Sequence, residues 1–442
     1  MKILYQTLGC KLNFAETSSL ADSLRHAGHE TVHRGEQADV CILNTCSVTD
    51  VADQKGRQAI RRLHREHPDA KIIVTGCYAQ LQPERVAGIE GVTMVVGSNE
   101  KDRIQSIIEV ISSSSASPSK NLYRFSPEYY TDLATPQGRL SEAGRRFHPS
   151  CSKEDRTRCF LKVQDGCDYF CTYCTIPMAR GTSRNAPIAD TVALAQKAID
   201  EGAKEIVLTG VNIGDFGRST GETFLELLHA LDEVNGEVRY RISSCEPNLL
   251  SDQIIDFVAS SRHFAPHFHI PLQSGSNEVL KIMHRRYSRE LFQERVERIR
   301  SRMPGAFIGV DCMVGVRGET EEMFGDYYRF IEQLPVCQLH VFPYSERRGT
   351  RMVDMDLPRV SNEEQRRRVE VLLRLSESKL AAFYAAHRGE QATVLWEAAG
   401  KGNTLTLNST RQKTMAGWTE NYIRVSAPYQ KEKINQFEQI WI

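Results

Sequence analysis

The chain has 442 residues, more than one ordinary hydrophobic core organises, so its length indicates about two to four domains. Its 56 basic and 56 acidic residues give a formal net charge of zero. This balance excludes a grossly basic nucleic-acid-binding protein, although local basic patches remain compatible with it. With 40% hydrophobic and 25% charged residues, the composition is that of a soluble globular protein.

The amino-terminal stretch MKILYQTLGCKLN lacks the features of a signal peptide, and no apolar run approaches the length of a membrane span. We therefore expect a cytoplasmic protein with no membrane partner. Twelve cysteines in a chain of this size do not form a disulfide scaffold. In a reducing compartment they are expected to be buried thiols, metal ligands or nucleophiles.

The first hundred residues alternate short apolar runs with amphipathic stretches. Strands are predicted over 2–7, 39–45, 71–76 and 92–97, and helices between them. This alternation predicts an α/β domain with a doubly wound parallel sheet over 1–112. The Ser-rich and Pro-dotted composition of 113–150 is typical of a linker.

A second and longer α/β pattern follows the linker. Its predicted strands are 160–164, 205–210, 240–244, 267–273, 307–315 and 338–344, with helical stretches between them and a charged helix over 362–389. Six such units predict either an open doubly wound sheet or part of a (β/α) barrel. The remaining residues, from about 388 to 442, alternate apolar and polar residues and predict a small all-β domain.

Three cysteines stand at the spacing C-x3-C-x2-C directly after the first strand of this second pattern: Cys167, Cys171 and Cys174. They lie at the carboxyl end of the predicted sheet, where α/β folds place their chemistry. A zinc site would need a fourth ligand, and neither His148 nor Cys159 has an evident position to supply one. Three thiolates on a [4Fe–4S] cube would instead leave one iron open to a small molecule.

Three further cysteines, Cys10, Cys46 and Cys77, each follow a predicted strand of the first domain. The carboxyl ends of parallel strands share one edge of a sheet, so these thiols are expected to converge there. The pattern predicts a second three-thiolate site. Cys41 falls inside its strand and is expected to be a small buried hydrophobe.

The C-x3-C-x2-C run, with Tyr173 before its last cysteine, resembles the radical S-adenosylmethionine (SAM) enzymes. In that family the open iron binds SAM, and an electron from the cluster cleaves it to a 5′-deoxyadenosyl radical. Candidate SAM contacts, chosen from polar residues at strand ends and beside the cysteines, are Tyr173, Thr209, Ser243 and Gln273.

Almost the whole chain resembles the radical-SAM methylthiotransferases, through LGCKLNFAE, LNTCSVTDVADQK, VTGCYAQ, FLKVQDGCDYFCTYCTIPMARG, PLQSGSNEVLKIMHRRY and GWTENYIRV. The resemblance implies a central radical-SAM core over 151–385, formed by a partial (β/α)6 barrel, and a TRAM-like RNA-binding domain over 386–442. It also implies two [4Fe–4S] clusters, on Cys10, Cys46 and Cys77 and on the central triplet. No acid/base or nucleophilic residues need be sought beyond them, because an aromatic C–H offers neither an acidic proton nor a leaving group.

Within this family, LTGVNIGDFG at 208–217 most resembles the branch that acts on N6-threonylcarbamoyladenosine (t6A) at position 37 of tRNA, beside the anticodon. The implied reaction converts t6A to its 2-methylthio form. One SAM methylates sulfur carried by the N-terminal cluster, and a second yields the radical that removes the C2 hydrogen. The implied partners are tRNA, SAM, a sulfur donor and an electron donor such as flavodoxin or ferredoxin.

Other functions stay open at this stage. Within the family, the substrate could be isopentenyladenosine in tRNA or an aspartate of a ribosomal protein. Outside it, the alternatives are a zinc-dependent RNA-binding protein and an iron–sulfur electron carrier. One stretch departs from the family pattern, since GVRGET places Val316 and Arg317 where Phe and Pro are common.

Overall fold

The computed structural model describes residues 1–113, 147, 149–152, 157–397, 404–407 and 410–442. The predicted linker over 113–150 therefore lies almost wholly outside the described residues. The chain forms two compact units. The first contains Met1–Ser152, Lys162–Ala186 and Ser345–Met355, and the second contains Lys153–Leu161, Pro187–Tyr344 and Asp356–Ile442. Each unit is described by itself.

The sheet of the first unit confirms the predicted doubly wound α/β fold. Its order is β2-β1-β3-β4-β5, formed by Glu30–Val32, Lys2–Thr7, Val40–Thr45, Lys71–Gly76 and Val92–Val95, and every pairing is parallel. Four of the five strands fall where they were predicted, whereas the three-residue edge strand β2 was missed. The strand order reverses between β1 and β3, and open α/β sheets bind ligands at such a point, outside the carboxyl ends of the strands.

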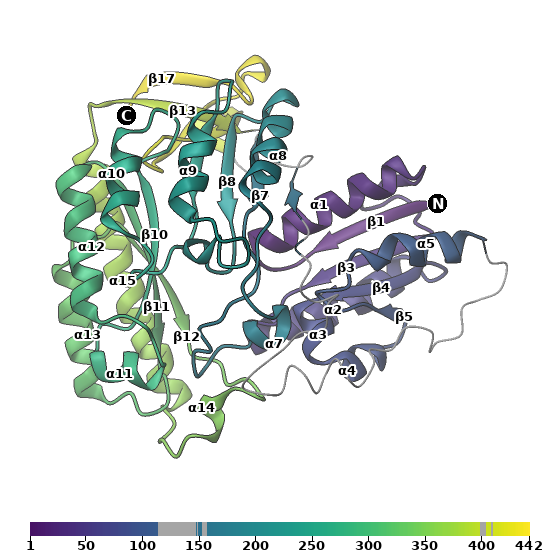
Figure 1. Cartoon of the computed structure of the whole chain (residues 1–442), viewed down its shortest axis with the longest axis horizontal. Coiled ribbons are helices and arrows are strands. Elements are labelled where there is room, and N and C mark those ends of the chain that lie inside the picture. Colours follow the sequence, from purple (N-terminus) through teal and green to yellow (C-terminus); the bar gives the residue numbers. More distant parts are fainter. Residues whose placement is uncertain (114–146, 148, 153–156, 398–403, 408–409) are drawn as a thin grey trace. The chain divides into compact units, whose positions relative to one another are not determined.

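Helices cover both faces of this sheet (Figure 1). They are α1 (Lys11–His26), α2 (Asp50–Glu66), α3 (Cys77–Leu81), α4 (Pro83–Ala87) and α5 (Arg103–Ser113). On one face, Leu24 of α1 and Ile108 of α5 pack with Ile42 of β3. On the other, Leu63 of α2 packs with Leu43. Both faces are thus buried, as the near-continuous apolar runs of parallel strands require.

The first unit also contains two segments distant in sequence. Lys162–Ala186 carries the C-x3-C-x2-C run and α7 (Ile176–Arg180), and Ser345–Met355 carries α14 (Arg351–Asp354). The short strand β6 (Ser150–Cys151) belongs to the same unit. All six cysteines predicted to bind clusters therefore lie in one compact unit.

The second unit contains the predicted partial barrel. Its strands are β7 (Arg158–Lys162, whose last residue belongs to the first unit), β8 (Glu205–Thr209), β9 (Arg239–Ile242), β10 (His267–Gln273), β11 (Phe307–Val314) and β12 (Gln338–Pro343). Strand β8 lies between β7 and β9, and β11 lies between β10 and β12. Parallel bridges from Tyr240 to Phe264 and from Ser244 to His269 connect these two groups.

Helices lie on the outer side of these strands, as Figure 1 shows for α10, α12 and α13. In chain order they are α8 (Ile188–Asp200), α9 (Phe224–Asp232), α10 (Asp252–Ser260), α11 (Asn277–Ile282), α12 (Arg289–Arg302), α13 (Glu321–Gln333) and α15 (Asn362–Ala386). Several begin at a Ser or Thr whose side chain accepts a backbone hydrogen bond, for example Thr223, Ser288 and Thr320. The charged helix predicted over 362–389 is α15.

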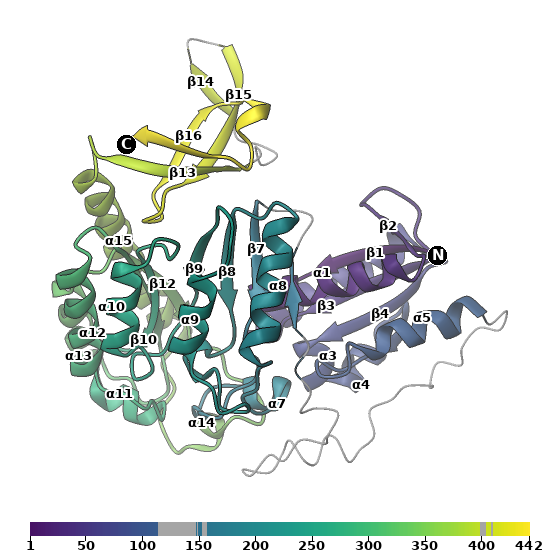
Figure 2. The same ribbon diagram turned by 45° about the horizontal axis from the view of Figure 1, so that its top comes forward.

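A small antiparallel sheet ends the chain, as predicted (Figure 2). It contains β13 (Gln391–Glu397), β14 (Thr404–Leu407), β15 (Thr410–Trp418), β16 (Arg424–Pro428) and β17 (Phe437–Trp441). In the order β14-β15-β13-β17, with β16 also on β15, every pair is antiparallel.

A buried cluster of ion pairs and hydrogen bonds connects this sheet to the barrel strands of the same unit. Glu205 accepts hydrogen bonds from Arg239 (2.6 Å) and Arg241 (3.0 Å). The two guanidinium groups also donate to the main-chain oxygens of Thr393, Trp418, Thr419 and Glu420. Although burial opposes ionisation, the two arginines lower the pKa of Glu205 to about 2. The carboxylate is therefore ionised at neutral pH and pairs with both buried guanidinium groups.

One expectation about the cysteines was wrong. Cys151 and Cys159 are disulfide-bonded, whereas the sequence predicted no disulfide, and the other ten cysteines are free. Among the described residues, no helix is both long and apolar enough to cross a membrane.

We expect Glu205→Gln to lower the free energy of unfolding by about 3–5 kcal/mol at pH 7, because it leaves two buried guanidinium groups without a counter-charge. The carboxylate's contribution is present above its unfolded-state pKa, near 4.5, and is lost as the pH falls toward about 2. The difference between the two proteins should therefore shrink over that range. Denaturant titration monitored by circular dichroism measures both effects.

Glu237→Gln is the matched control, because Glu237 pairs with Lys204 at the surface and its side chain is 65% exposed. This variant should lower the free energy of unfolding by less than about 1 kcal/mol. Equal losses for the two variants would contradict the account of the buried cluster.

Candidate cluster site

Cys10, Cys46 and Cys77 each stand directly beyond a strand at the carboxyl edge of the first sheet. Cys10 precedes α1 after β1, Cys46 follows β3, and Cys77 is the first residue of α3 after β4. Because β3 lies between β1 and β4, the three positions are adjacent along this edge. The strand-then-cysteine pattern of the sequence thus predicted their positions in the fold.

Two glycines allow the chain to approach closely at these positions. Gly9 has φ +105°, and a Cβ there would lie 2.6 Å from the Cβ of Cys46 and 3.1 Å from its sulfur. Gly76 has φ +95°, and a Cβ there would lie 2.3 Å from the main-chain oxygen of Thr45. Neither position has space for a side chain, and both use backbone angles that glycine adopts without strain.

The three thiols influence one another electrostatically. Burial, together with the neighbouring Cys77 and Cys10, raises the pKa of Cys46 to about 12. Burial also raises the pKa of Cys77, while the Arg180 guanidinium lowers it. A cationic cluster would remove these penalties, because thiolates are the form that binds metal.

Asparagine side chains hold the loops after β1 and β3. Asn13, fully buried in α1, donates from Nδ2 to the main-chain oxygens of Leu8 (2.8 Å) and Thr45 (3.1 Å). Asn44 donates in turn to the main-chain oxygen of Asn13 (3.1 Å) and to Oγ1 of Thr17 (3.0 Å). These bonds fix the loop that carries Cys10 relative to the end of β3.

The segment with the C-x3-C-x2-C run forms a closed loop. Asp165 and Arg184 exchange two main-chain hydrogen bonds of 2.9 Å, and the nitrogen of Cys167 donates to the oxygen of Gly181 (3.0 Å). Within the loop, the nitrogen of Cys174 donates to the oxygen of Cys171 (3.0 Å). The sulfur of Cys174 accepts from the nitrogen of Ile176 (3.4 Å). Such a donor stabilises a thiolate, and hydrogen bonds to sulfur tune iron–sulfur clusters.

A buried ion network, which the sequence did not reveal, joins this loop to α1. Arg180, 1% exposed, donates to Oδ1 of Asn13 (2.6 Å), Oε1 of Glu16 (2.9 Å) and Oδ1 of Asp165 (3.0 Å). Lys162 also contacts Glu16 (2.8 Å) and Asp165 (2.7 Å). The network therefore connects the segment behind Cys10 to both ends of the loop that carries Cys167, Cys171 and Cys174.

The network contains two carboxylates, Glu16 and Asp165, and four cations that contact them, Arg180, Lys101, Lys162 and Arg184. Burial opposes ionisation of Glu16, but Arg180, Lys101 and Lys162 hold its pKa well below the usual range. Burial also opposes ionisation of Asp165, but Lys162, Arg180 and Arg184 hold its pKa below the usual range. Both carboxylates are therefore ionised and pair with the surrounding cations.

A second buried arginine, Arg347, comes from the segment Ser345–Met355. It donates to Oγ of Ser47 (2.8 Å) and to Oδ2 of Asp53 (2.7 Å). Ser47 directly follows Cys46, so the contact supports that loop. Nothing in the sequence around Arg180 or Arg347 distinguishes these arginines from exposed ones, because the partners of each are distant in sequence.

The candidate SAM contacts fall in different parts of the fold. Thr209, Ser243 and Gln273 lie at the carboxyl ends of β8, β9 and β10 in the second unit, whereas Tyr173 belongs to the first. The hydroxyl of Thr209 donates to the main-chain oxygen of Leu161 (3.2 Å), and Gln273 has φ +64°. Their assignment as SAM contacts stays a prediction.

The stretch that departs from the family pattern forms an ordered turn. Glu319 accepts hydrogen bonds from the nitrogen of Gly315 (2.5 Å) and from Arg368 (2.8 Å), and Val316 is fully buried. The backbone can thus keep its shape with Val316 and Arg317 in place.

The six cysteines offer the kind of donor atom that iron–sulfur clusters bind. In the described part of the chain, no group of three or more His, Cys, Asp or Glu side chains lies at metal-binding spacing. Nevertheless, two sets of three cysteines occupy the loops of one unit, and Gly9 provides the close approach beside Cys46. Soft thiolate donors without a carboxylate or imidazole are typical of iron–sulfur and zinc sites.

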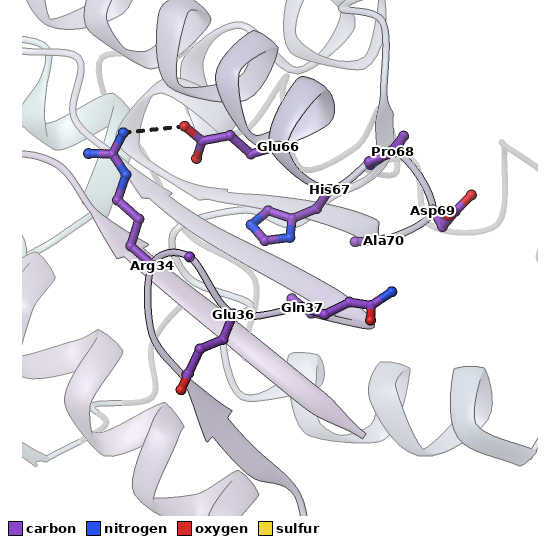
Figure 3. A pocket seen from close by; sticks show the side chains of 10 residues that line it. Arg34, Glu36, Gln37, Glu66, His67, Pro68, Asp69 and Ala70 are labelled. Carbon is purple, nitrogen blue, oxygen red and sulfur yellow. Dashed lines mark hydrogen bonds and ion pairs between the residues drawn. The ribbon is translucent and has the colours of Figure 1, made fainter.

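A cavity of about 480 Å³ lies elsewhere on the first unit (Figure 3). It is lined by residues 34–38 and 66–70, which precede β3 and β4. Arg34 pairs with Glu66 across it (3.3 Å). The cavity therefore lies at the amino edge of the sheet, opposite the edge that carries the cysteines.

Two family models match this chain. Residues 2–97 match the model described as "Uncharacterized protein family UPF0004", and residues 161–331 match the Radical SAM superfamily. Similar solved structures include a radical SAM methyltransferase, TsrM of Kitasatospora setae, with a TM-score of 0.57 at 15% identity. The match covers 77% of this chain and 72% of that one, and shows the shared fold.

Curated relatives extend over nearly the whole chain. The threonylcarbamoyladenosine tRNA methylthiotransferase MtaB of Bacillus subtilis is 37% identical over 428 residues, covering 96% of this chain and 89% of the relative. MtaB of Aquifex aeolicus is 33% identical, and the match covers 89% of this chain and 92% of the relative. The tRNA-2-methylthio-N(6)-dimethylallyladenosine synthase of Fusobacterium nucleatum is 29% identical, and the match covers 91% of this chain and 89% of the relative.

These matches define the chain as a radical SAM enzyme, with SAM and a [4Fe–4S] cluster as its cofactors. More narrowly, it belongs to the MtaB branch of the radical-SAM methylthiotransferases, and it is a transferase. The family predicted from the sequence motifs is therefore confirmed.

We expect Gly9→Ala to displace the loop that carries Cys10, because its Cβ would collide with Cys46. After anaerobic reconstitution, the variant should hold less iron and acid-labile sulfide than the wild type. Gly28→Ala is the matched control, since Gly28 also has positive φ (+86°) but no atom lies within 4 Å of the added Cβ. Equal iron and sulfide contents in the two variants would contradict the role of Gly9.

Proposed function

We propose that this enzyme adds a methylthio group to C2 of N6-threonylcarbamoyladenosine at position 37 of tRNA. The observation that carries the proposal is the 37% identity to a relative of that name over 96% of the chain. The placement of all six cysteines in one compact unit supports it.

The proposal includes two [4Fe–4S] clusters. Cys10, Cys46 and Cys77 would hold one, and Cys167, Cys171 and Cys174 the other. When bound, they would supply an electron for the cleavage of SAM and an iron to which sulfur can attach. Each set would leave one iron without a protein ligand.

The remaining residues of the unit hold these ligands in place. Arg180 presents a buried positive charge near Cys77, which lowers the pKa of that thiol and favours its thiolate form. Asn13 and Arg347 fix the loops that carry Cys10 and Cys46. Tyr173, Thr209, Ser243 and Gln273 are proposed to contact SAM.

The proposal also assigns domains and partners. Residues 1–112 form the methylthiotransferase domain, 113–150 a linker, 151–385 the radical-SAM core and 386–442 a TRAM-like domain that binds tRNA. The enzyme requires an electron donor such as flavodoxin or ferredoxin, and a sulfur donor. It acts in the cytoplasm.

Two clusters predict about eight irons per chain after anaerobic reconstitution, and about four in the variant Cys10→Ala/Cys46→Ala/Cys77→Ala. Iron and sulfide analysis with Mössbauer spectroscopy measures both. One cluster in the wild-type protein would contradict the proposal. Zinc without iron or sulfide would instead indicate the zinc-dependent RNA-binding alternative.

The substrate is tested by mass spectrometry of tRNA nucleosides from a strain that lacks the gene. We expect the 2-methylthio form of t6A to be absent, to return with the wild-type chain and to stay absent with Cys171→Ala. Cys41→Ala is the matched control and should restore the 2-methylthio form of t6A. Cys41 packs in the hydrophobic core of the sheet and is not one of the proposed cluster ligands.

Loss of the 2-methylthio form of isopentenyladenosine instead would assign the other tRNA branch. If the tRNA were unchanged and a ribosomal protein lost a methylthio group, the enzyme would belong to the branch that modifies an aspartate of a ribosomal protein. Either result would contradict the proposed substrate.

A further inference from the structure

A row of polar side chains crosses three neighbouring strands of the barrel. Ser244 lies just beyond β9, His269 in β10 and Asp311 in β11. His269 makes hydrogen bonds with both others: its Nδ1 lies 2.8 Å from Oγ of Ser244, and its Nε2 lies 2.9 Å from Oδ1 of Asp311. The carboxylate only accepts, so Nε2 carries a proton and the orientation of the ring is fixed.

The row lies on the inner face of the curved sheet. Ile270, Val310 and Cys312 alternate with His269 and Asp311 along the strands, so they point to the opposite face, and all three are fully buried. The side chains of His269 and Asp311 are each 20% exposed. Two partly exposed polar groups side by side inside a barrel are not required for its core.

Gly309 leaves space within the row. A Cβ at this position would lie 3.5 Å from Nε2 of His340 in β12 and 3.7 Å from Cδ2 of His269. The two imidazole rings are perpendicular neighbours, with centroids 5.0 Å apart. The row thus continues to a fourth strand, with no side chain at Gly309 between the rings.

A buried ion pair extends the row at the other end. Glu246, two residues beyond Ser244, pairs with Arg285, whose side chain is only 4% exposed. Burial raises the pKa of Glu246, and Asp311 raises it further, so the two carboxyl groups interact. We call Ser244, Glu246, His269, Arg285, Asp311 and His340 the inner polar row.

An aromatic layer closes the barrel strands on the amino side of this row. Tyr422 of the C-terminal sheet lies 4.8 Å from the ring of His267 and 5.2 Å from that of Phe307, centroid to centroid. His267 and Phe307 stack at 5.4 Å. His267 lies two residues before His269 on β10, and Phe307 lies four residues before Asp311 on β11. The row therefore faces the carboxyl ends of the strands, where barrels bind their ligands.

We propose that the inner polar row binds the N6 substituent of the target adenosine and selects a polar substituent over an apolar one. This inference rests on the proposed function. A threonylcarbamoyl group carries urea N–H groups, a hydroxyl and a carboxylate. Glu246 and Asp311 can accept from the N–H and hydroxyl groups, while the imidazoles and Arg285 can donate to the carboxylate.

A dimethylallyl group, which the name of the Fusobacterium nucleatum relative specifies, offers none of these partners. It would take the polar groups of the row out of water without replacing their hydrogen bonds. Sites built to hydrogen-bond a substrate reject analogues that lack the matching groups. The composition of the row is thus a basis for choosing between the two modified adenosines.

The test uses the reconstituted full-length enzyme and three anticodon stem-loops, which carry t6A, N6-dimethylallyladenosine or unmodified adenosine at position 37. Fluorescence anisotropy gives the dissociation constant of each, and equilibrium dialysis gives that of SAM. We expect the wild type to prefer the t6A stem-loop by about tenfold or more. Glu246→Gln and His340→Phe should each remove most of that preference while binding the unmodified stem-loop and SAM as the wild type does.

His263→Phe is the matched control, because His263 hydrogen-bonds Asp232 at the end of α9, away from the row. It should keep the preference. If both row variants kept the wild-type preference for the t6A stem-loop, the inference would be overturned. It would also be overturned if their affinity for SAM fell together with that preference, because the row would then bind SAM.

The outcome separates this inference from the proposed function. A wild-type enzyme that methylthiolates t6A while its row variants keep their preference contradicts only the inference. A wild-type enzyme that neither prefers nor methylthiolates t6A contradicts the proposed function.

Discussion

The buried contact of Arg180 with Glu16 and Asp165 is the interaction on which the cluster-binding unit depends. Glu16 lies in the helix that begins after Cys10, and Asp165 begins the loop of the C-x3-C-x2-C run. Desolvating such groups costs several kcal/mol for each ion, so they are stable only when every charge is paired. Here each carboxylate contacts further cations, since Lys101 and Lys162 pair with Glu16, and Lys162 and Arg184 pair with Asp165.

This network explains why a segment from the middle of the chain belongs to the same unit as the N-terminal sheet. The sheet sets the positions of Cys10, Cys46 and Cys77, because they end adjacent parallel strands. The network then brings the central cysteine loop into that unit. A reaction that needs both sulfur and a radical at one adenosine requires both cysteine sets in a fixed arrangement, and the ion network supplies a physical basis for it within the unit.

The sequence predicts much of the fold, because its signals are local. Apolar runs located β1, β3, β4 and the six barrel strands, and the cysteines that follow strands predicted their own places at the carboxyl edge. Strand β2 was missed because three residues are too few to show periodicity. Arg180 and Arg347 were missed because their partners lie 15–167 and 294–300 residues away, and single arginines give no local signal of burial. The disulfide-bonded state of Cys151 and Cys159 was missed for a different reason, since the expected compartment disfavours disulfides.

The most direct test of the account is the cluster content of Arg180→Met after anaerobic reconstitution, with Arg25→Met, a change at a partly exposed ion pair, as the reference. Loss of the Arg180 guanidinium removes the hydrogen bonds that join Asn13 and Glu16 to Asp165, so both cysteine sets should lose order together. The account predicts that iron and sulfide per chain fall to half of the reference or less, with the signals of both clusters reduced. Full occupancy of both clusters, with an unfolding midpoint equal to that of the reference, would contradict it.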